Sequence, residues 1–223
     1  MIDKNTFGFL KQLNSNNSKE WLDEHRSDYN FAKDDVLNLT QTLIHAEAAF
    51  DVGIAKADLD PNKCITRLNR DLRFSKDKTP YKTDYYIVLN QHGKNSPSAF
   101  YYVHIEPNNC FVGGGVYNPQ PAELKKIRSE INASFDEWNQ LINEKYFQLK
   151  FPSGIHNSRT LVRSPKEFED DNPAIEFLKM KGFYTQEPLT DKEMQSNLTL
   201  EKIVDYFKTV KPLVDYLNLA IND

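Results

Sequence analysis

A run of basic side chains between residues 67 and 82 has the residue types and the spacing best suited to bind an anion. Six Lys and Arg residues share these sixteen positions with only two carboxylates, Asp71 and Asp77; they are Arg67, Arg70, Arg73, Lys76, Lys78 and Lys82. This basic segment therefore carries a charge of +4 in a chain whose net charge is −4. Because crowded like charges repel, we expect either counter-charges or an anionic ligand beside them.

The chemistry of the basic segment is that of a phosphate site. Arg presents planar, bidentate donors to phosphate or carboxylate oxygens, and Lys adds mobile point charges. Hydroxyl donors are interleaved with them at Ser75, Thr79 and Tyr81. Connections of about a dozen residues are uncommon in compact domains and are often functional. The alternative is a solvated loop in which Arg70 or Arg73 pairs with Asp71 or Asp77.

The glycine run Gly113, Gly114 and Gly115 is a second candidate. Three glycines at the end of a strand allow positive φ and bring N–H groups close to an anion. A helix that starts near Pro121 would add its positive end. The spacing is that of neither a P-loop nor a dinucleotide-binding fingerprint. The alternative is a bulge or sharp bend that packs against a bulky neighbour.

Two single residues complete the candidate site. His104 is predicted to lie within a strand, on the face that carries Phe100 and Tyr102. It could act as a general base if that strand lies beside the basic segment, and is otherwise a core or surface histidine. Arg163 and Lys166 form a second cationic pair. They are ordinary surface charges unless the fold brings them to the basic segment. We expect the basic segment, the glycine run and Arg163 to converge on one cleft at the edge of an antiparallel sheet.

Composition and missing motifs exclude several classes of protein. A pI near 5.8 argues against general coating of nucleic acid. The sequence has no zinc-ligand spacing and no calcium-binding loop, so we expect no metal site, and no cofactor is identified. No apolar run approaches the ~18 residues of a membrane span, so no membrane partner is expected. Two cysteines, Cys64 and Cys110, without a signal-like segment indicate reduced thiols and a cytoplasmic protein.

The periodicity of apolar residues predicts an α+β protein. A stripe at spacings of three and four predicts one helix between Leu22 and Phe50, or two helices broken near Asp34. The middle of the chain changes to strand patterns, at residues 64–69, 84–90, 100–106 and 110–117. Because the connections between them are short, these strands must pair antiparallel. Further helices are predicted from Pro121, at 135–146 and 174–181, and from Thr199 with an interruption at Pro212.

Helix caps are predicted at three places. Thr6 is a candidate cap for a short first helix, and Asn17 with Glu20, like Thr190 with Glu193, has the spacing of a capping box. Neither a repeat nor a linker interrupts the chain. The prediction is a single α+β domain over residues 1–223, with a central antiparallel sheet covered by N-terminal and C-terminal helices.

Residues 70–83, Arg-Asp-Leu-Arg-Phe-Ser-Lys-Asp-Lys-Thr-Pro-Tyr-Lys-Thr, resemble the signature of the domain-of-unknown-function family 2461. Further pieces that agree follow in order: Asn16-Asn17, Glu20-Trp21-Leu22, residues 113–119, Leu124, Ile127-Arg128, residues 161–166 and residues 172–174. The resemblance spans nearly the whole chain, which favours a single domain. Glu167 departs from the pattern, since the family more often has Gly there, and this makes the backbone less permissive. The family has no assigned activity, so the resemblance implies no reaction.

Three functions follow from these features. The preferred one is a protein that binds or acts on a phosphorylated small molecule or nucleotide through the basic segment and the glycine run. The second is a nucleic-acid-binding module in which aromatic side chains stack on bases, with Phe74, Tyr81, Tyr85 and Tyr101 as candidates. The third is an interaction domain that docks on an acidic partner. The acidic net charge favours the first, and the sequence leaves open whether the protein is an enzyme.

Overall fold

The computed structural model describes residues 1–73 and 75–222, and these form two compact units. The first unit consists of Met1–Lys94, Tyr102–Val112 and Pro188–Asp205. The second consists of Asn95–Tyr101, Gly113–Glu187 and the chain from Tyr206 onward. Strands β2 (Phe100–Ile105), β3 (Cys110–Val116) and β4 (Phe183–Leu189) and helix α11 (Thr199–Asn222) contribute residues to both units. Among the described residues, no helix is both long and apolar enough to cross a membrane.

A four-stranded antiparallel sheet runs in the order β1-β2-β3-β4, which confirms the α+β class. Its strands are β1 (Tyr85–Leu89), β2 (Phe100–Ile105), β3 (Cys110–Val116) and β4 (Phe183–Leu189). The first three coincide with predicted strands. The strand predicted at 64–69 is wrong, because this stretch makes only isolated bridges, between Ile65 and Ile87 and between Asn69 and Tyr81. Strand β4 was not predicted, since its polar residues and Pro188 obscure the strand pattern.

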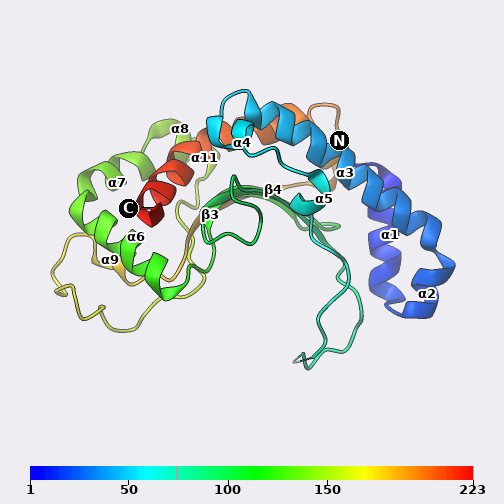
Figure 1. Cartoon of the computed structure of the whole chain (residues 1–223), viewed down its shortest axis with the longest axis horizontal. Helices are drawn as coiled ribbons and strands as arrows, with labels where there is room; N and C mark the ends of the chain where they lie inside the picture. The colour runs from blue at the N-terminus through cyan, green and yellow to red at the C-terminus, as the bar shows by residue number, and fades with distance from the viewer. Residues whose placement is uncertain (74, 223) are drawn as a thin grey trace. The chain divides into compact units, whose positions relative to one another are not determined.

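The five N-terminal helices of the first unit pack around the longest of these five, α3. They are α1 (Lys4–Ser15), α2 (Lys19–Glu24), α3 (Arg26–Ala48), α4 (Val52–Lys56) and α5 (Pro61–Cys64). Helix α3 contacts α1, α4, α5 and strand β1 (Figure 1). The predicted stripe provides its buried face, with Ala32, Val36, Leu39 and Leu43 at most 3 % exposed. Burial of each of the larger side chains contributes about 1.5–3 kcal/mol, which is enough to position α3.

The helix starts near the N-terminus differ from the predictions. Asp3, not Thr6, caps α1, and the Thr6 hydroxyl instead donates to Asp35 Oδ2 at 2.7 Å. Helix α2 is capped by Ser18, whose hydroxyl accepts from the Trp21 N–H, and not by Asn17. The break in the long stripe falls at His25 and not near Asp34.

The C-terminal helix α11 (Thr199–Asn222) is continuous through Pro212, so the predicted interruption is wrong. Its residues on both sides of the proline are fully buried, among them Phe207, Val210, Leu213 and Leu217. This burial offsets the helix hydrogen bond that proline cannot donate. Just before it, α10 (Asp191–Met194) begins with the predicted capping box of Thr190 and Glu193.

The second unit is built around Trp138, which is completely buried. Its helices are α6 (Pro121–Ala133), α7 (Phe135–Ile142), α8 (Lys145–Lys150) and α9 (Ile175–Leu178), with the later part of α11. The Trp138 ring lies 5.4 to 6.0 Å from those of Phe177, Phe183 and Tyr216.

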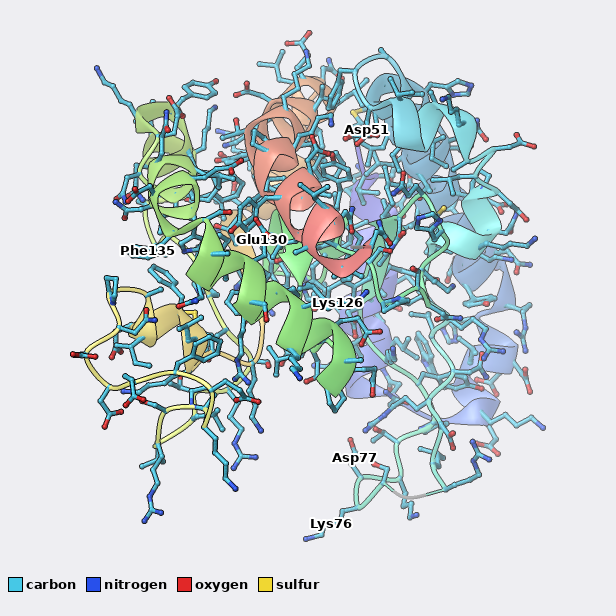
Figure 2. All side chains as sticks on the ribbon, turned by 60° about the vertical axis from the view of Figure 1, so that its left-hand side comes forward. Asp51, Lys76, Asp77, Lys126, Glu130 and Phe135 are labelled. Carbon is cyan, nitrogen blue, oxygen red and sulfur yellow. The ribbon has the colours of Figure 1, made fainter. Side chains whose placement is uncertain are left out.

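Figure 2 shows Lys126 and Glu130 on α6 and Phe135 at the start of α7. Lys126 Nζ donates to the Ile221 carbonyl at 2.9 Å and so ties α6 to the end of α11. Pro121 opens α6 as predicted, whereas the helical stretch predicted at 135–146 divides into α7 and α8.

Candidate anion-binding site

The basic segment belongs to the first unit and lies in the long connection between α5 and β1 (Figure 1). Its two arms run antiparallel, because Lys82 N donates to the Leu68 carbonyl at 2.7 Å and Arg70 N donates to the Pro80 carbonyl at 2.9 Å. We call residues 65–69 and 81–84 the stem and residues 70–80 the tip. Phe74, a candidate for base stacking, lies outside the described residues.

An asparagine fixes the stem to the N-terminal helices of the same unit. The Asn17 side chain donates from Nδ2 to the Tyr81 carbonyl at 2.9 Å and accepts from Tyr81 N at 3.0 Å. Both backbone groups of Tyr81 are therefore satisfied, and its side chain is only 7 % exposed. Burial is the main cause that raises the pKa of its hydroxyl. Tyr81 thus holds the stem in place and does not present a free hydroxyl to a ligand.

At the tip, the two arginines are paired with the two carboxylates of the segment. Arg70 Nη1 donates to Asp77 Oδ2 and to the Thr79 hydroxyl, and the Arg70 bond is the main cause that lowers the Asp77 pKa to about 2. Arg73 binds Asp71 with two donors, Nε to Oδ1 at 3.0 Å and Nη2 to Oδ2 at 2.6 Å. These hydrogen bonds are the main cause that lowers the Asp71 pKa. This is the solvated-loop pairing, which was the alternative reading of the sequence.

The remaining polar groups of the tip face outward or bond locally. Lys78 Nζ donates to the Leu72 carbonyl at 3.0 Å. Lys76 is exposed, and Figure 2 shows it beside Asp77 at the end of the connection. Ser75 is half-buried. The tip therefore contains its own counter-charges and leaves Lys76 without an ion pair among the described residues.

Three cations at the stem have no such partners. Lys94 Nζ donates to the Ile65 carbonyl. Arg67 lies two residues after Ile65 in the chain. Lys82 lies on the opposite arm, and its backbone N–H donates to the Leu68 carbonyl. Burial is the main cause that lowers the Lys94 pKa, and the positive charges of Arg67 and Lys82 lower it further. In the part of the chain that the structure describes, none of the three forms an ion pair. We call Arg67, Lys82 and Lys94 the cation trio.

His104 lies on β2 in the same unit and is 4 % exposed. Its Nδ1 is 2.8 Å from the Asn109 carbonyl oxygen, and because a carbonyl only accepts, Nδ1 carries the proton. Nε2 faces Asp84 Oδ2 at 3.6 Å and Glu106 Oε2 at 4.0 Å. Both distances are too long for direct hydrogen bonds but within the range of an ion pair, so Nε2 faces two carboxylates.

Aromatic rings surround this histidine. The rings of Tyr86 and Phe111 each have centroids 4.4 Å from that of His104, and both residues are half-buried. The Thr66 hydroxyl, next to Arg67, accepts from the Tyr86 N–H at 2.9 Å. The aromatic group therefore starts where the stem joins β1. Partly open rings are a surface on which a planar base can stack.

The glycine run lies inside β3, within the strand predicted at 110–117 and not in a turn, and its residues are buried. A Cβ on Gly114 would lie 2.9 Å from Val210 Cγ1. One on Gly115, whose φ is +125°, would lie 2.3 Å from the Phe183 carbonyl oxygen. Close packing between neighbours of the second unit explains these two glycines.

Arg163 also belongs to the second unit, in the irregular stretch before α9. It is exposed and lines a surface depression together with Lys166, Glu169 and Asp170. The basic segment belongs to the other unit, so its convergence with Arg163 and the glycine run stays a prediction.

Among the described residues, no group of three or more His, Cys, Asp or Glu side chains could hold a metal ion. Cys64 and Cys110 are buried and unpaired, and burial is the main cause that raises the pKa of each thiol to about 11. They are therefore protonated packing residues at neutral pH and not nucleophiles.

Sequence reasoning missed Lys94. This lysine lies beyond strand β1, in a turn-rich stretch with no basic neighbours in sequence, and only the pairing of the stem with β1 brings it to Arg67. The one local signal was the turn chemistry around Gly93, which returns the chain toward the stem.

The comparison with protein families defines the class of this α+β protein. The family described as "Conserved hypothetical protein (DUF2461)" matches residues 5–216, which include the basic segment, His104, the glycine run and Arg163. The chain belongs to this family, as the residues of the basic segment indicated. No curated protein and no solved structure matches it.

Proposed function

We propose that the protein binds a phosphorylated small molecule at the cation trio of its first unit. The observation that carries the proposal is that Arg67, Lys82 and Lys94 lie together without an ion pair among the described residues. Repulsion among three cations raises the free energy of the empty site, and a phosphate dianion would relieve it. The Arg67 guanidinium can bind two phosphate oxygens at once, while the two lysines add charge.

The tip would supply further donors on binding. Its Arg70–Asp77 and Arg73–Asp71 pairs are exposed, with 55 % and 59 % of the respective Asp side chains open to solvent. Exposed pairs of this kind contribute little to stability, so a phosphate could replace either carboxylate at small cost.

The aromatic group around His104 favours a nucleotide over a bare sugar phosphate. Tyr86 and Phe111 offer partly open rings next to the stem, and a base could stack there while its phosphate meets the trio. An unprotonated Nε2 of His104 could accept a proton from a bound hydroxyl, which would make the site catalytic. We also propose that the protein works in the cytoplasm, where Cys64 and Cys110 stay reduced.

Calorimetry with a panel of inorganic phosphate, ribose 5-phosphate, AMP and ATP tests this proposal. Arg67→Lys keeps the charge but loses the bidentate fork, so we expect about tenfold weaker binding, since a charge-assisted hydrogen bond contributes about 1.5–3 kcal/mol. Lys82→Gln should weaken binding similarly. Lys56→Gln, at an exposed lysine that ends α4 in the same unit, is the matched control and should bind normally.

Two outcomes would overturn the proposal. One is equal affinity of the wild type, Arg67→Lys and Lys82→Gln for every member of the panel, and the other is no binding at all. A steep loss of affinity for single-stranded oligonucleotide, about a thousandfold between 50 and 200 mM salt, with no binding of mononucleotides, would assign the trio to nucleic acid instead.

A further inference from the structure

The second unit has a cavity of its own at the start of helix α6. Its volume is about 630 Å³, within the range of small-molecule sites. One part of the wall is apolar and comes from Pro119, Pro121, Leu124, Leu161 and Phe168. The remaining wall is polar or charged, so the cavity has the two-part lining that orients a small ligand.

Cations dominate the charged part of the wall. Lys125 and Arg128 come from α6, and Lys181 comes from the residues before β4. Glu167, which lies in the irregular stretch before α9, is the carboxylate of the lining. Three cations and one carboxylate leave a net charge of +2, which would attract a dianion.

Arg128 has hydrogen-bonding capacity that the protein does not use. Its Nη2 donates to the Met180 carbonyl at 2.9 Å, while its Nε is shielded from solvent and has no hydrogen-bond partner. Burial is the main cause that lowers the pKa of Arg128, and the charge of Glu167 partly opposes this. A buried donor without a partner is destabilising, so a hydrogen-bond acceptor supplied by a ligand would stabilise it.

The start of helix α6 adds to the positive electrostatic potential of the cavity. Gln120 is its N-cap but makes no side-chain cap hydrogen bond, and both Gln120 and Pro121 line the cavity. The unsatisfied N–H groups of the first turn give this end of a thirteen-residue helix a partial positive charge.

We propose that this cavity binds a small molecule in which a dianionic group, a phosphate monoester or a dicarboxylate, is attached to a compact apolar body. The dianion meets Arg128, Lys125 and Lys181, and the apolar body lies against the proline, leucine and phenylalanine side chains. This site lies wholly in the second unit, so it does not depend on the proposed function of the cation trio. Glu167 lowers the affinity of the site, because its charge repels the ligand.

Calorimetry in the Lys82→Gln background, which weakens the trio, tests the cavity by itself. The probes are phenyl phosphate and phthalate as dianions with an apolar body, inorganic phosphate without one, and benzoate as a monoanion. We expect both aromatic dianions to bind, at least one of them tenfold more tightly than inorganic phosphate or benzoate. The comparison of phenyl phosphate with phthalate shows which dianion the cavity prefers.

Variants of the lining distinguish this cavity from the rest of the surface. Arg128→Lys should weaken the dianion about tenfold, whereas Arg159→Lys, the same change at an exposed arginine of the same unit outside the lining, should have no effect. Because Arg128 is partly buried, Lys125→Gln at an exposed position serves as a second variant and should weaken binding several-fold. Thermal midpoints of all variants show that they are folded.

Glu167→Gln should strengthen dianion binding, whereas Arg128→Lys and Lys125→Gln should weaken it. A merely structural role of Glu167 would not produce this increase in affinity. Removal of this charge should strengthen dianion binding about threefold to tenfold and benzoate binding by a smaller factor, because benzoate carries half the charge. The proposal is wrong if no dianion binds at millimolar concentration, or if Arg128→Lys, Lys125→Gln and Glu167→Gln all bind as tightly as their parent.

Discussion

The basic segment of the first unit and the cavity of the second unit both gather cations, but they do so in opposite ways. The segment concentrates six cations in sixteen residues, and its tip pairs both of its arginines with its own aspartates. The cavity brings Lys125 and Arg128 of α6 together with Lys181, which is far from them in sequence, and its lining includes a single carboxylate, Glu167. A high density of charge along the sequence is therefore a poor guide to unpaired charge in space.

The physical reason is that short chain segments can satisfy themselves. Asp71 lies two residues from Arg73, and Asp77 lies seven residues from Arg70, so each pair forms within one loop. The members of the cation trio are not neutralised in this way, because they come from both arms of the stem and from the segment after β1. We expect the anion sites to lie where separate elements bring cations together, and the following predictions test this comparison.

The largest effect should come from Gly115, which decides whether the glycine run serves packing or anions. An added Cβ would clash with the Phe183 carbonyl oxygen at 2.3 Å in a backbone with φ of +125°. We expect Gly115→Ala to lower the free energy of unfolding by about 3 kcal/mol or more, which is a fall of roughly 6–12 °C in Tm. Gly8→Ala, in helix α1 with nothing within 4 Å of the new Cβ, should raise Tm slightly. If Gly115→Ala has an unchanged Tm but binds anions more weakly, the glycine run contributes to anion binding and not to packing.

A medium effect should come from Glu193, whose ion pair is anchored in helix α10, in contrast to the pairs of the tip. Its bond with Lys202 is the main cause that lowers its pKa from 4.5 to about 2, and it also completes the capping box. Because its side chain is 39 % exposed, we expect Glu193→Gln to cost only about 1 kcal/mol at pH 7.

The pH dependence of this effect has a definite sign. A depressed carboxyl pKa stabilises the fold fully above the unfolded value of 4.5, and this contribution is lost as the pH falls toward 2. The difference in Tm between the wild type and Glu193→Gln should therefore be constant from pH 7 to pH 5 and shrink below pH 4.5. A difference that is undiminished at pH 2 would show that the cap and not the charge is responsible.

The smallest effect should come from the tip of the basic segment. Arg73 and Lys76 are exposed, and Asp71 has 59 % of its side chain in solvent, so Arg73→Ala with Lys76→Ala should change Tm by less than about 2 °C. Scanning calorimetry in phosphate-free buffer measures this directly. A fall in Tm of more than about 10 °C would mean that the tip contributes strongly to the stability of the fold. The tip would then differ from the cavity in more than the pairing of its charges.

Local patterns accounted for much of the fold and for part of the site. Alternating aromatic and β-branched residues predicted β1, β2 and β3, and the spacing of Thr190 and Glu193 predicted the cap of α10. Strand β4 escaped prediction because Gln186, Glu187 and Pro188 weaken its pattern. Helix α11 passes through Pro212 because burial of its flanking residues outweighs a local rule.

The sequence by itself determined the class of the protein, its family, the position of the basic segment and the residues able to neutralise the tip. These depend on periodicity and on charges a few residues apart, which short-range geometry fixes. Only the tertiary structure decided which cations stay unpaired. Lys94 reaches the stem through the pairing with β1, and Arg128 meets Lys181 through the packing of the second unit. Such contacts form when distant segments bury apolar surface together, and no local pattern encodes them.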